Sequence, residues 1–352
     1  MSDRALQERL VASPTRMGEY LGAPAVAGYG DTAVEFAALR RACGITSLTW
    51  RQRFLVRGPD RVRWLNGMVT NNIRGLDPNR GVYSYLLNPQ GRILADMVCF
   101  NCGDHLVIET DAAQVAGLRE ALEKYIIMDE VELADAEPDT KFAVTGPRAA
   151  EVLRSALAWS EDLATLAPLH MRDVSWHGAT PTVIRTDFAV LPSFEVWLPA
   201  TVAAELWQSL HDSGATPVGY EAMELLRVWA GRPQYGADIS QRYLPQETAQ
   251  DRALHFNKGC YVGQEIVERI HSRGLVHRLL AAFAVNGPPP AAGARIQVDG
   301  KDAGEVTSAA SLPLESGAKT AALGYIRREA AAPGTAVQVG GSSATVVRPP
   351  IQ

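Results

Sequence analysis

Two stretches of the chain share the same pattern of hydrophobic and polar positions. Residues 54–65 (FLVRGPDRVRWL) and 142–153 (FAVTGPRAAEVL) both read F-x-V-x-G-P and both end in leucine. Each begins as a short β-rich run, passes through Gly-Pro and continues with a helical pattern. Proline is well tolerated in the first turn of a helix, because its missing N–H would have no partner there. The pattern therefore predicts two related strand–turn–helix units.

The segments that follow the two copies are also alike. After the first copy we expect strands at 81–88, 92–100 and 105–110, a helix at 112–126 and a strand at 131–136. After the second we expect strands at 171–176, 180–186 and 194–199, and a helix at 201–214 that ends at glycine. Both halves roughly follow the order β-α-β-β-β-α-β. This order predicts an α+β fold of two related modules with antiparallel sheets, rather than one doubly wound parallel sheet.

From about residue 276 the pattern changes. Helical periodicity fades, glycine and proline become frequent at 286–293, and short β-type runs follow one another to the end of the chain. Such a texture is typical of a small all-β domain, either a barrel or a sandwich.

Composition limits the classes of function. The chain has 352 residues, of which 47% are hydrophobic, and a formal net charge of −5. This is enough for two or three domains, and without a basic tail we do not expect nucleic acid as the main partner. An uninterrupted apolar run of about 18 residues, which a membrane span needs, is missing from the sequence. The charged segment 1–14 lacks the apolar stretch of a signal peptide, so we expect a cytoplasmic protein.

The four cysteines, Cys43, Cys99, Cys102 and Cys260, are too few for a disulfide framework and are expected to be reduced. Cys99 and Cys102 form a single C-x-x-C at the end of a predicted strand. A zinc site needs about four ligands and a redox C-x-x-C should open a helix, so we predict no metal site here. The sequence also lacks the G-x-G-x-x-G, P-loop, H-E-x-x-H and G-x-S-x-G motifs of several common enzyme classes.

Asp96 is the only charged residue between Ile93 and Phe100. On a strand both faces of this segment would be apolar, so Asp96 needs a partner or a ligand, or it must be protonated. A structural carboxylate and a functional one both satisfy this pattern.

Arg227 lies at the end of an apolar helical segment, LLRVWAGRPQYG. A guanidinium in that setting should face a carboxylate or stack on a flat ring. A structural salt bridge and a ligand contact are both open.

The segment 257–265, NKGCYVGQE, carries a cysteine with a choice of roles. Lys258 stands two residues before Cys260, and a nearby ammonium favours the thiolate. The two glycines allow close approach of the backbone to a ligand or another strand. Gln264 and Glu265 could orient a partner and are candidate cofactor-binding residues. The alternative is a tight loop in which Cys260 is buried.

The octapeptide K-G-C-Y-x-G-Q-E within this segment resembles the signature of the YgfZ family of folate-binding proteins. These proteins are related to the aminomethyltransferase (T-protein) of the glycine cleavage system, and the resemblance covers nearly the whole chain. It implies three domains in a clover-leaf arrangement around a central hole that holds folate. Because the first two domains interleave in this family, the expected boundaries are approximate: 1–50 with 138–225, 51–137 with 226–275, and the barrel at 276–352.

The resemblance also implies roles for individual residues. Asp96 takes the place of an aspartate close to the reactive nitrogens of tetrahydrofolate, and Arg227 that of an arginine beside the folate. The chain departs from T-proteins at Leu191, which stands where their Y-T-G-E-x-G-F-E run has a pterin-binding glutamate. Leucine cannot accept the N–H hydrogen bonds of the pterin, which leaves open whether the protein is an enzyme. Trp50 could offer a flat face to the ring.

Three hypotheses follow. The first is a tetrahydrofolate-binding protein that supports iron–sulphur cluster assembly or repair, with Cys260, helped by Lys258, as the reactive or ligating group. Four cysteines do not make a self-sufficient cluster site, so assembly factors or client proteins would be partners. The second is a folate-dependent aminomethyltransferase or other one-carbon transferase, in which Asp96 steers the proton at a folate nitrogen. The third is a folate-binding scaffold in which Cys260 is only structural.

Overall fold

The computed structural model describes residues 16–274 and 276–352, so the segment 1–14, expected not to be a signal peptide, lies outside the described residues. The chain divides into two compact units made of alternating segments. Unit 1 contains the described part of Met1–Val62, with Gly75–Val82 and Val98–Met223; unit 2 contains Arg63–Arg74, Tyr83–Met97 and Glu224–Gln352. The expected three-domain boundaries stay a prediction. None of the helices in the described part of the chain is both long and apolar enough to cross a bilayer.

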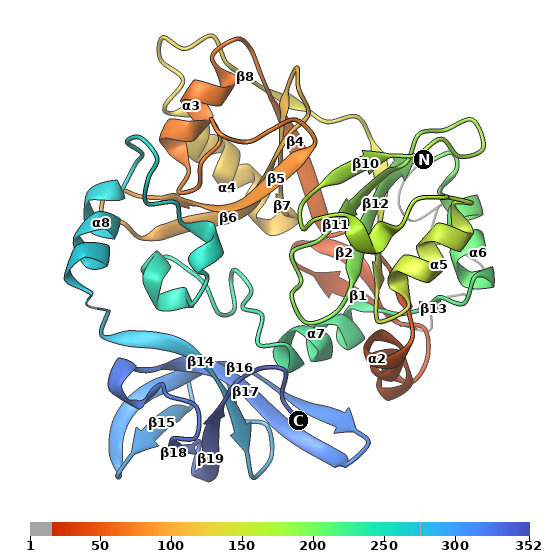
Figure 1. Ribbon diagram of the computed structural model, residues 1–352. Coiled ribbons are helices and arrows are strands. Elements are labelled where there is room, and N and C mark those ends of the chain that lie inside the picture. The colour runs from red at the N-terminus through yellow and green to blue at the C-terminus, as the bar shows by residue number, and fades with distance from the viewer. Residues whose placement is uncertain (1–15, 275) are drawn as a thin grey trace. The chain divides into compact units, whose positions relative to one another are not determined.

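The first sheet has six strands in the order β10-β11-β12-β9-β3-β13 (Figure 1). Its strands are β3 (Gly44–Ser47), β9 (Asp139–Thr145), β10 (Met171–Asp173), β11 (Thr182–Arg185), β12 (Ser193–Pro199) and β13 (Thr216–Pro217). Neighbours are antiparallel, except that β13 runs parallel to β3. The apolar faces of α5 (Ala149–Ala156) and α6 (Ala203–Asp212) pack on this sheet around the fully buried side chains of Phe142, Phe194 and Trp207.

The second sheet has five strands in the order β5-β6-β7-β4-β8. Its strands are β4 (Arg51–Arg57), β5 (Arg80–Leu87), β6 (Ile93–Asn101), β7 (Leu106–Asp111) and β8 (Glu132–Asp135). Helix α3 (Arg61–Met68) follows β4, and α4 (Ala112–Glu123) follows β7 and contacts both β4 and β7.

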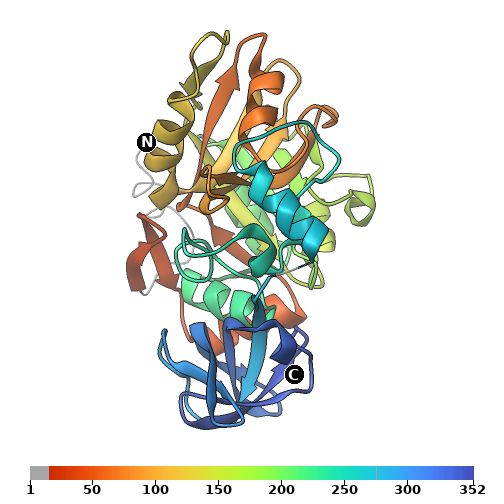
Figure 2. The same ribbon diagram turned by 90° about the vertical axis from the view of Figure 1, so that its left-hand side faces the viewer.

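The C-terminal segment forms a closed barrel in the order β14-β17-β16-β15-β18-β19, drawn in blue in Figure 1 and, from another side, in Figure 2. Its strands are β14 (Arg278–Val285), β15 (Arg295–Val298), β16 (Lys301–Leu314), β17 (Gly317–Arg327), β18 (Ala336–Val339) and β19 (Ser342–Val347). Phe283, Ile296, Val306 and Ile326 lie in its core, each at most 1% exposed. The prediction of an all-β C-terminal domain is confirmed, and the structure decides for a barrel.

The remaining elements connect these parts. They are the hairpin β1 (Arg16–Tyr20) and β2 (Ala23–Gly28), the helices α2 (Thr32–Arg41), α7 (Tyr220–Trp229) and α8 (Gln264–Arg273), and the short 3₁₀ turns η1 (Leu163–Thr165), η2 (Pro245–Thr248), η3 (Asp251–Ala253) and η4 (Arg328–Ala330). The barrel follows α8 after a few residues, and α7 precedes the loops that carry η2 and η3.

The predicted repeat is confirmed. The first half runs β4-α3-β5-β6-β7-α4-β8 and the second β9-α5-β10-β11-β12-α6-β13. Both Gly-Pro turns depend on their glycine. Gly58 has φ +99° and a Cβ there would lie 2.0 Å from the Glu130 carbonyl oxygen, while Gly146 has φ +138° and its Cβ would lie 2.5 Å from that of Ala42. A side chain at either turn would therefore clash with backbone.

Candidate functional site

Asp96 lies near the middle of β6, on the less covered face of the strand. Positions along β6 alternate between buried and partly exposed, and Asp96 stands between the buried Ala95 and Met97. The Tyr83 hydroxyl donates a hydrogen bond to the carboxylate, with 2.7 Å between Tyr83 Oη and Asp96 Oδ2. Burial and the negative charge of Asp96 raise the pKa of Tyr83 well above its usual value, so the phenol keeps its proton and remains the donor.

Tyr83 is itself held by neighbours from distant parts of unit 2. The Arg252 guanidinium carbon lies 4.0 Å from the centre of the Tyr83 ring, a cation–π contact from an exposed side chain. The Asn71 amide nitrogen donates to the carbonyl oxygens of both Tyr83 and Arg252, at 2.9 and 2.8 Å. Three segments thus place an accessible cation beside the phenol that binds Asp96.

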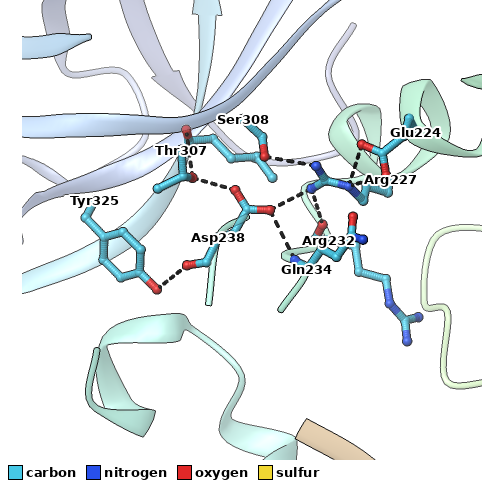
Figure 3. Close-up of polar contacts among 9 residues, drawn as sticks. Glu224, Arg227, Arg232, Gln234, Asp238, Thr307, Ser308 and Tyr325 are labelled. Atoms are coloured by element: carbon cyan, nitrogen blue, oxygen red, sulfur yellow. Dashed lines mark hydrogen bonds and ion pairs between the residues drawn. The ribbon is translucent and has the colours of Figure 1, made fainter. Parts of the chain in front are cut away.

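Arg227 forms the centre of a second polar cluster in unit 2, drawn in Figure 3. Its Nε donates to Glu224 at 2.9 Å, its Nη1 to Asp238 at 2.6 Å and to the Arg232 carbonyl at 3.3 Å, and its Nη2 to Ser308 at 2.9 Å. The expectation of a carboxylate facing Arg227 is confirmed. These bonds tie α7 to the loop after it and to barrel strand β16, which is a structural role.

Asp238 is the fully buried carboxylate of this cluster, at 0% exposure. Besides Arg227 it accepts from the Gln234 backbone N–H at 3.1 Å and from the Thr307 hydroxyl. The Tyr325 hydroxyl donates to its backbone carbonyl at 2.9 Å (Figure 3). Every one of these donors is protein, as the burial of a charge requires.

Lys258 supports the loop that carries Cys260. Its ammonium donates to the carbonyl oxygens of Asn66, Val69 and Asn71, at 2.7, 2.6 and 2.6 Å. This is one acceptor for each of its three N–H groups, at the C-terminal end of α3, where carbonyls lack helical partners and a cation is favourable. The geometry therefore gives Lys258 a structural role in the loop, whereas the sequence suggested a thiolate-stabilising one.

The rest of the octapeptide forms the start of α8. Gly263 has φ +81°, and a Cβ there would lie 2.6 Å from the Asn88 carbonyl oxygen in the β5–β6 turn. The Gln264 side chain accepts from the Tyr261 N–H at 3.3 Å, and Glu265 pairs with Arg269 one helical turn later at 2.6 Å. Glu265 is 81% exposed, so the proposed folate contacts of Gln264 and Glu265 have no support from these local bonds.

Cys260 is exposed, whereas Cys43 and Cys99 are buried and Cys102 is partly buried. The alternative of a buried Cys260 is therefore wrong. Burial raises the pKa of the Cys102 thiol to about 11, which makes that residue a poor nucleophile near neutral pH. Within residues 16–274 and 276–352, no cluster of three or more His, Cys, Asp or Glu side chains could hold a metal ion.

Two known protein families match this chain. Residues 6–258 match the GCVT N-terminal domain, and residues 277–351 match the CAF17 C-terminal beta-barrel domain. The chain belongs to the GCVT family. It is 26% identical to an aminomethyltransferase of Nostoc sp., over 79% of this chain and 76% of that protein. It is 28% identical to an aminomethyltransferase of Saccharopolyspora erythraea, over 88% of this chain and 86% of that protein.

A solved structure shares the fold. The glycine cleavage system aminomethyltransferase T from Bartonella henselae aligns with a TM-score of 0.86 and 24% identity, over 99% of this chain and 97% of that one. The predicted T-protein-like α+β fold with a C-terminal barrel is confirmed. The narrower resemblance to the YgfZ family stays a hypothesis.

In this GCVT-family chain, Leu191 lies in the loop between β11 and β12 and is partly exposed. Its side chain has no hydrogen-bond acceptor, so it cannot replace a pterin-binding carboxylate. The expectation that Trp50 offers a flat face to a ligand is not supported by its position in the core. Trp50 is 5% exposed, packs among Ala23, Ala25 and Leu48, and meets the Tyr20 ring edge-on at 4.9 Å between centroids. A core role explains Trp50 better than a ligand-facing one.

Sequence reasoning missed a buried charge cluster across the strands of unit 1. Glu109, 1% exposed, meets Arg51 at 3.2 Å and Lys141 at 3.6 Å. Burial opposes ionisation of Glu109, but Arg51 and Lys141 outweigh it and hold its pKa below the usual range. Glu195 accepts a hydrogen bond from the Trp197 indole N–H at 3.2 Å, and burial together with Glu109 raises the pKa of Glu195 to about 7.

Charged residues within otherwise apolar strands were the sequence signal for this cluster: Glu195 is the single charge of β12, and β4, β7 and β9 each carry two or three. Arg53 is directly opposite Glu109 in the β4–β7 pairing, Lys141 is opposite Trp197, and Glu195 is opposite Ala143. Two nearby carboxylates with pKa values driven apart are common at functional sites. Glu195 is therefore a candidate proton-binding group, and it belongs to none of the motifs found in the sequence.

Proposed function

We propose that this GCVT-family protein binds tetrahydrofolate at Asp96 and supports the assembly or repair of iron–sulphur clusters through Cys260. The observation that carries the folate part is the Asp96–Tyr83 pair, an aspartate on β6 held by a buried phenol. The iron–sulphur part is supported by the exposed thiol of Cys260, which lies within the octapeptide that resembles the YgfZ signature.

The donor set at Asp96 suits a reduced folate. A carboxylate offers about four acceptor positions, so the bond from Tyr83 leaves capacity for the N–H of a ring nitrogen. Tyr83 holds Asp96 in one orientation, and the Arg252 cation lies over the Tyr83 ring. Tetrahydrofolate, when bound, supplies a carrier for one-carbon units at its ring nitrogens. Asp96 would orient that nitrogen and accept or return its proton.

Cys260 would act on an iron–sulphur cluster as a substrate rather than as a resident cofactor. Cluster sites need several thiolates, and the chain has four cysteines, two of them buried. Assembly factors or client proteins would provide the remaining ligands. Lys258 contributes by fixing the loop, so its role in this proposal is to position Cys260.

A cellular test separates Cys260 from the other thiols. In a strain that depends on this protein for the activity of iron–sulphur enzymes, Cys260→Ser should lower that activity at least about tenfold. Cys102→Ser is the matched control, because Cys102 is a partly buried thiol with a raised pKa, and it should behave as wild type. Full activity of the Cys260→Ser strain rules out the iron–sulphur proposal.

Aminomethyl transfer is the second candidate, since curated relatives across most of the chain are aminomethyltransferases. Asp96 and Tyr83 could serve that chemistry as well, whereas Leu191 speaks against pterin recognition of the T-protein kind. The test is production of methylene-tetrahydrofolate from an aminomethylated carrier protein or a methylated amine. Turnover that is lost in Asp96→Asn would favour this candidate, and the absence of turnover by wild type eliminates it.

A further inference from the structure

A small cavity in unit 1 has a lining that the folate and thiol proposals do not use. It has a volume of about 160 Å³ and lies between the segment after α5 and the start of β10. Trp159, Leu163 and Leu166 supply an apolar wall. The polar lining residues come from two segments, Glu161 and Asp162 from the first and His170 and Arg172 from the second. The volume is below the 300–1,000 Å³ of pockets for drug-sized ligands, so it suits a molecule much smaller than folate.

Two of the charged side chains are available for a ligand. Among the described residues, neither Glu161 nor Arg172 makes a side-chain hydrogen bond or ion pair, and both are exposed at the cavity. Arg80 lies near the same wall but is paired with Asp77 at 3.3 Å. Arg172 is thus the available cation and Glu161 the available anion of one small space.

The groups around His170 are mainly positively charged. Burial and the positive charges of Arg80 and Arg172 lower the pKa of His170 below its usual value. The imidazole is therefore neutral at pH 7 and adds a hydrogen-bonding group rather than a second cation.

The backbone on both sides of the cavity is strained. Ala158, just before Trp159, has φ +48°, and Leu169, just before His170, has φ +59°. Non-glycine residues rarely take such positive φ angles, and they cluster where a binding geometry is imposed by the surrounding fold. The Trp159 ring packs partly on the core of the six-stranded sheet, which fixes the apolar wall.

Side chains of both charges surround one apolar wall, so the lining is complementary to a ligand that carries both charges and an apolar part. A phosphate or a dicarboxylate would meet Glu161 and Asp162, and a diamine would meet Arg172, with like charges in each case. A molecule that carries one carboxylate, one ammonium and a short aliphatic chain matches all three parts of the lining.

We propose that this cavity binds a small aliphatic α-amino acid, with its carboxylate at Arg172, its ammonium at Glu161 and its side chain against Trp159. The site lies within unit 1 and does not depend on the proposed function. Folate binding at Asp96 can fail without affecting it, and the reverse also holds.

The experiment titrates the full-length protein with L-valine and with its two one-charge analogues. Isobutylamine lacks the carboxylate and 3-methylbutanoate lacks the ammonium. Valine should bind with a millimolar Kd, and each analogue about threefold to fivefold more weakly, the change expected from one exposed ion pair. Ligand-observed NMR measures these affinities.

Two variants assign each charge to its arm of the ligand. Arg172→Gln should weaken valine about threefold to fivefold and leave isobutylamine unchanged, while Glu161→Gln should weaken valine equally and leave 3-methylbutanoate unchanged. Arg57→Gln, a change at an exposed arginine of β4 outside the cavity, should bind valine as wild type does. Circular dichroism verifies that each variant is folded.

Three results overturn the proposal. The first is no saturable binding of valine up to about 20 mM, a range that covers weak ligands of this size. The second is valine binding no tighter than the two analogues. The third is unchanged valine binding in Arg172→Gln.

Discussion

Two aspartates of unit 2 occupy opposite environments. Asp238 is fully buried and receives Arg227, a backbone N–H and the Thr307 hydroxyl, all from the protein. Asp96 lies on a partly exposed strand face and is held by Tyr83. Each belongs to a cluster that contains an arginine and a tyrosine, so residue type does not separate them. The two differ in the burial of the carboxylate. The contacts of Asp238 enclose it completely, whereas Tyr83 holds Asp96 on a partly exposed face of β6.

This comparison explains why Arg227 and Asp96 serve different ends. Arg227 uses its N–H groups to join α7, the following loop and barrel strand β16. All three nitrogens of this guanidinium donate to protein acceptors, so Arg227 stabilises the structure and its contact with a ligand would be limited to lining the site. Asp96 is the better candidate for direct contact with a ligand.

The largest expected effect is on Asp238. Asp238→Asn should lower the free energy of unfolding by about 3–5 kcal/mol, because Arg227 loses its fully buried counter-ion and keeps only the partly exposed Glu224. Denaturant unfolding measures the loss. The matched variant Asp96→Asn should change stability by less than about 1 kcal/mol, since Asp96 is partly exposed. Equal losses for the two variants would remove the distinction between a structural and a ligand-directed aspartate.

Glu195 extends the comparison to unit 1, since it is a partly buried carboxylate with a raised pKa. Its pKa is about 7 in the fold against 4.5 ordinarily, so between these values the folded state binds the extra proton. Stability should therefore fall as pH rises from about 4.5 to about 7, by up to roughly 3 kcal/mol. In Glu195→Gln this part of the pH dependence should vanish, as measured by unfolding at pH 5 and pH 8. Parallel pH profiles for variant and wild type would contradict the assignment.

Lys258 is expected to have an intermediate effect. Lys258→Met should cost about 1–3 kcal/mol, because three carbonyls at the end of α3 lose their charged donor. Thermal unfolding provides the measurement, and Glu265→Gln, on the exposed start of α8, serves as the control with little change. If Lys258→Met is as stable as wild type, the ammonium is not holding the Cys260 loop.

Tyr83 should show a small loss of stability. Tyr83→Phe removes one hydrogen bond and keeps the ring under Arg252, so the expected cost is about 0.5–1.5 kcal/mol. Folate affinity should fall more than stability, because Asp96 loses the group that orients it. An unchanged affinity would mean that Asp96 is positioned by other contacts.

The sequence revealed the repeat because local chemistry specifies it. The two Gly-Pro turns need glycine at Gly58 and Gly146, and the same helical pattern follows each, so the order of elements could be predicted. The hairpin of β1 and β2 could not, because its turn places Leu21 at φ +50° before Gly22. Leucine gives none of the usual turn signals for that conformation.

The site was only partly predictable for a related reason. Asp96 stood out as one charge in an apolar strand, and the resemblance supported it. The roles of Lys258 and Glu195, unlike that of Asp96, depend on groups that only folding brings together. The carbonyls that bind Lys258 lie about 190 residues earlier in the chain, and Glu195 depends on Glu109 from another strand. Spacing along the sequence does not carry such information.

Calorimetric titration with tetrahydrofolate, on wild type and on Asp96→Asn, tests the central claim most directly. We expect saturable binding by wild type and an affinity at least about tenfold lower in Asp96→Asn, equivalent to 1.4 kcal/mol, with stability nearly unchanged. No binding by wild type, or equal binding by the two proteins, would contradict the claim that Asp96 is the folate-contacting residue of this fold.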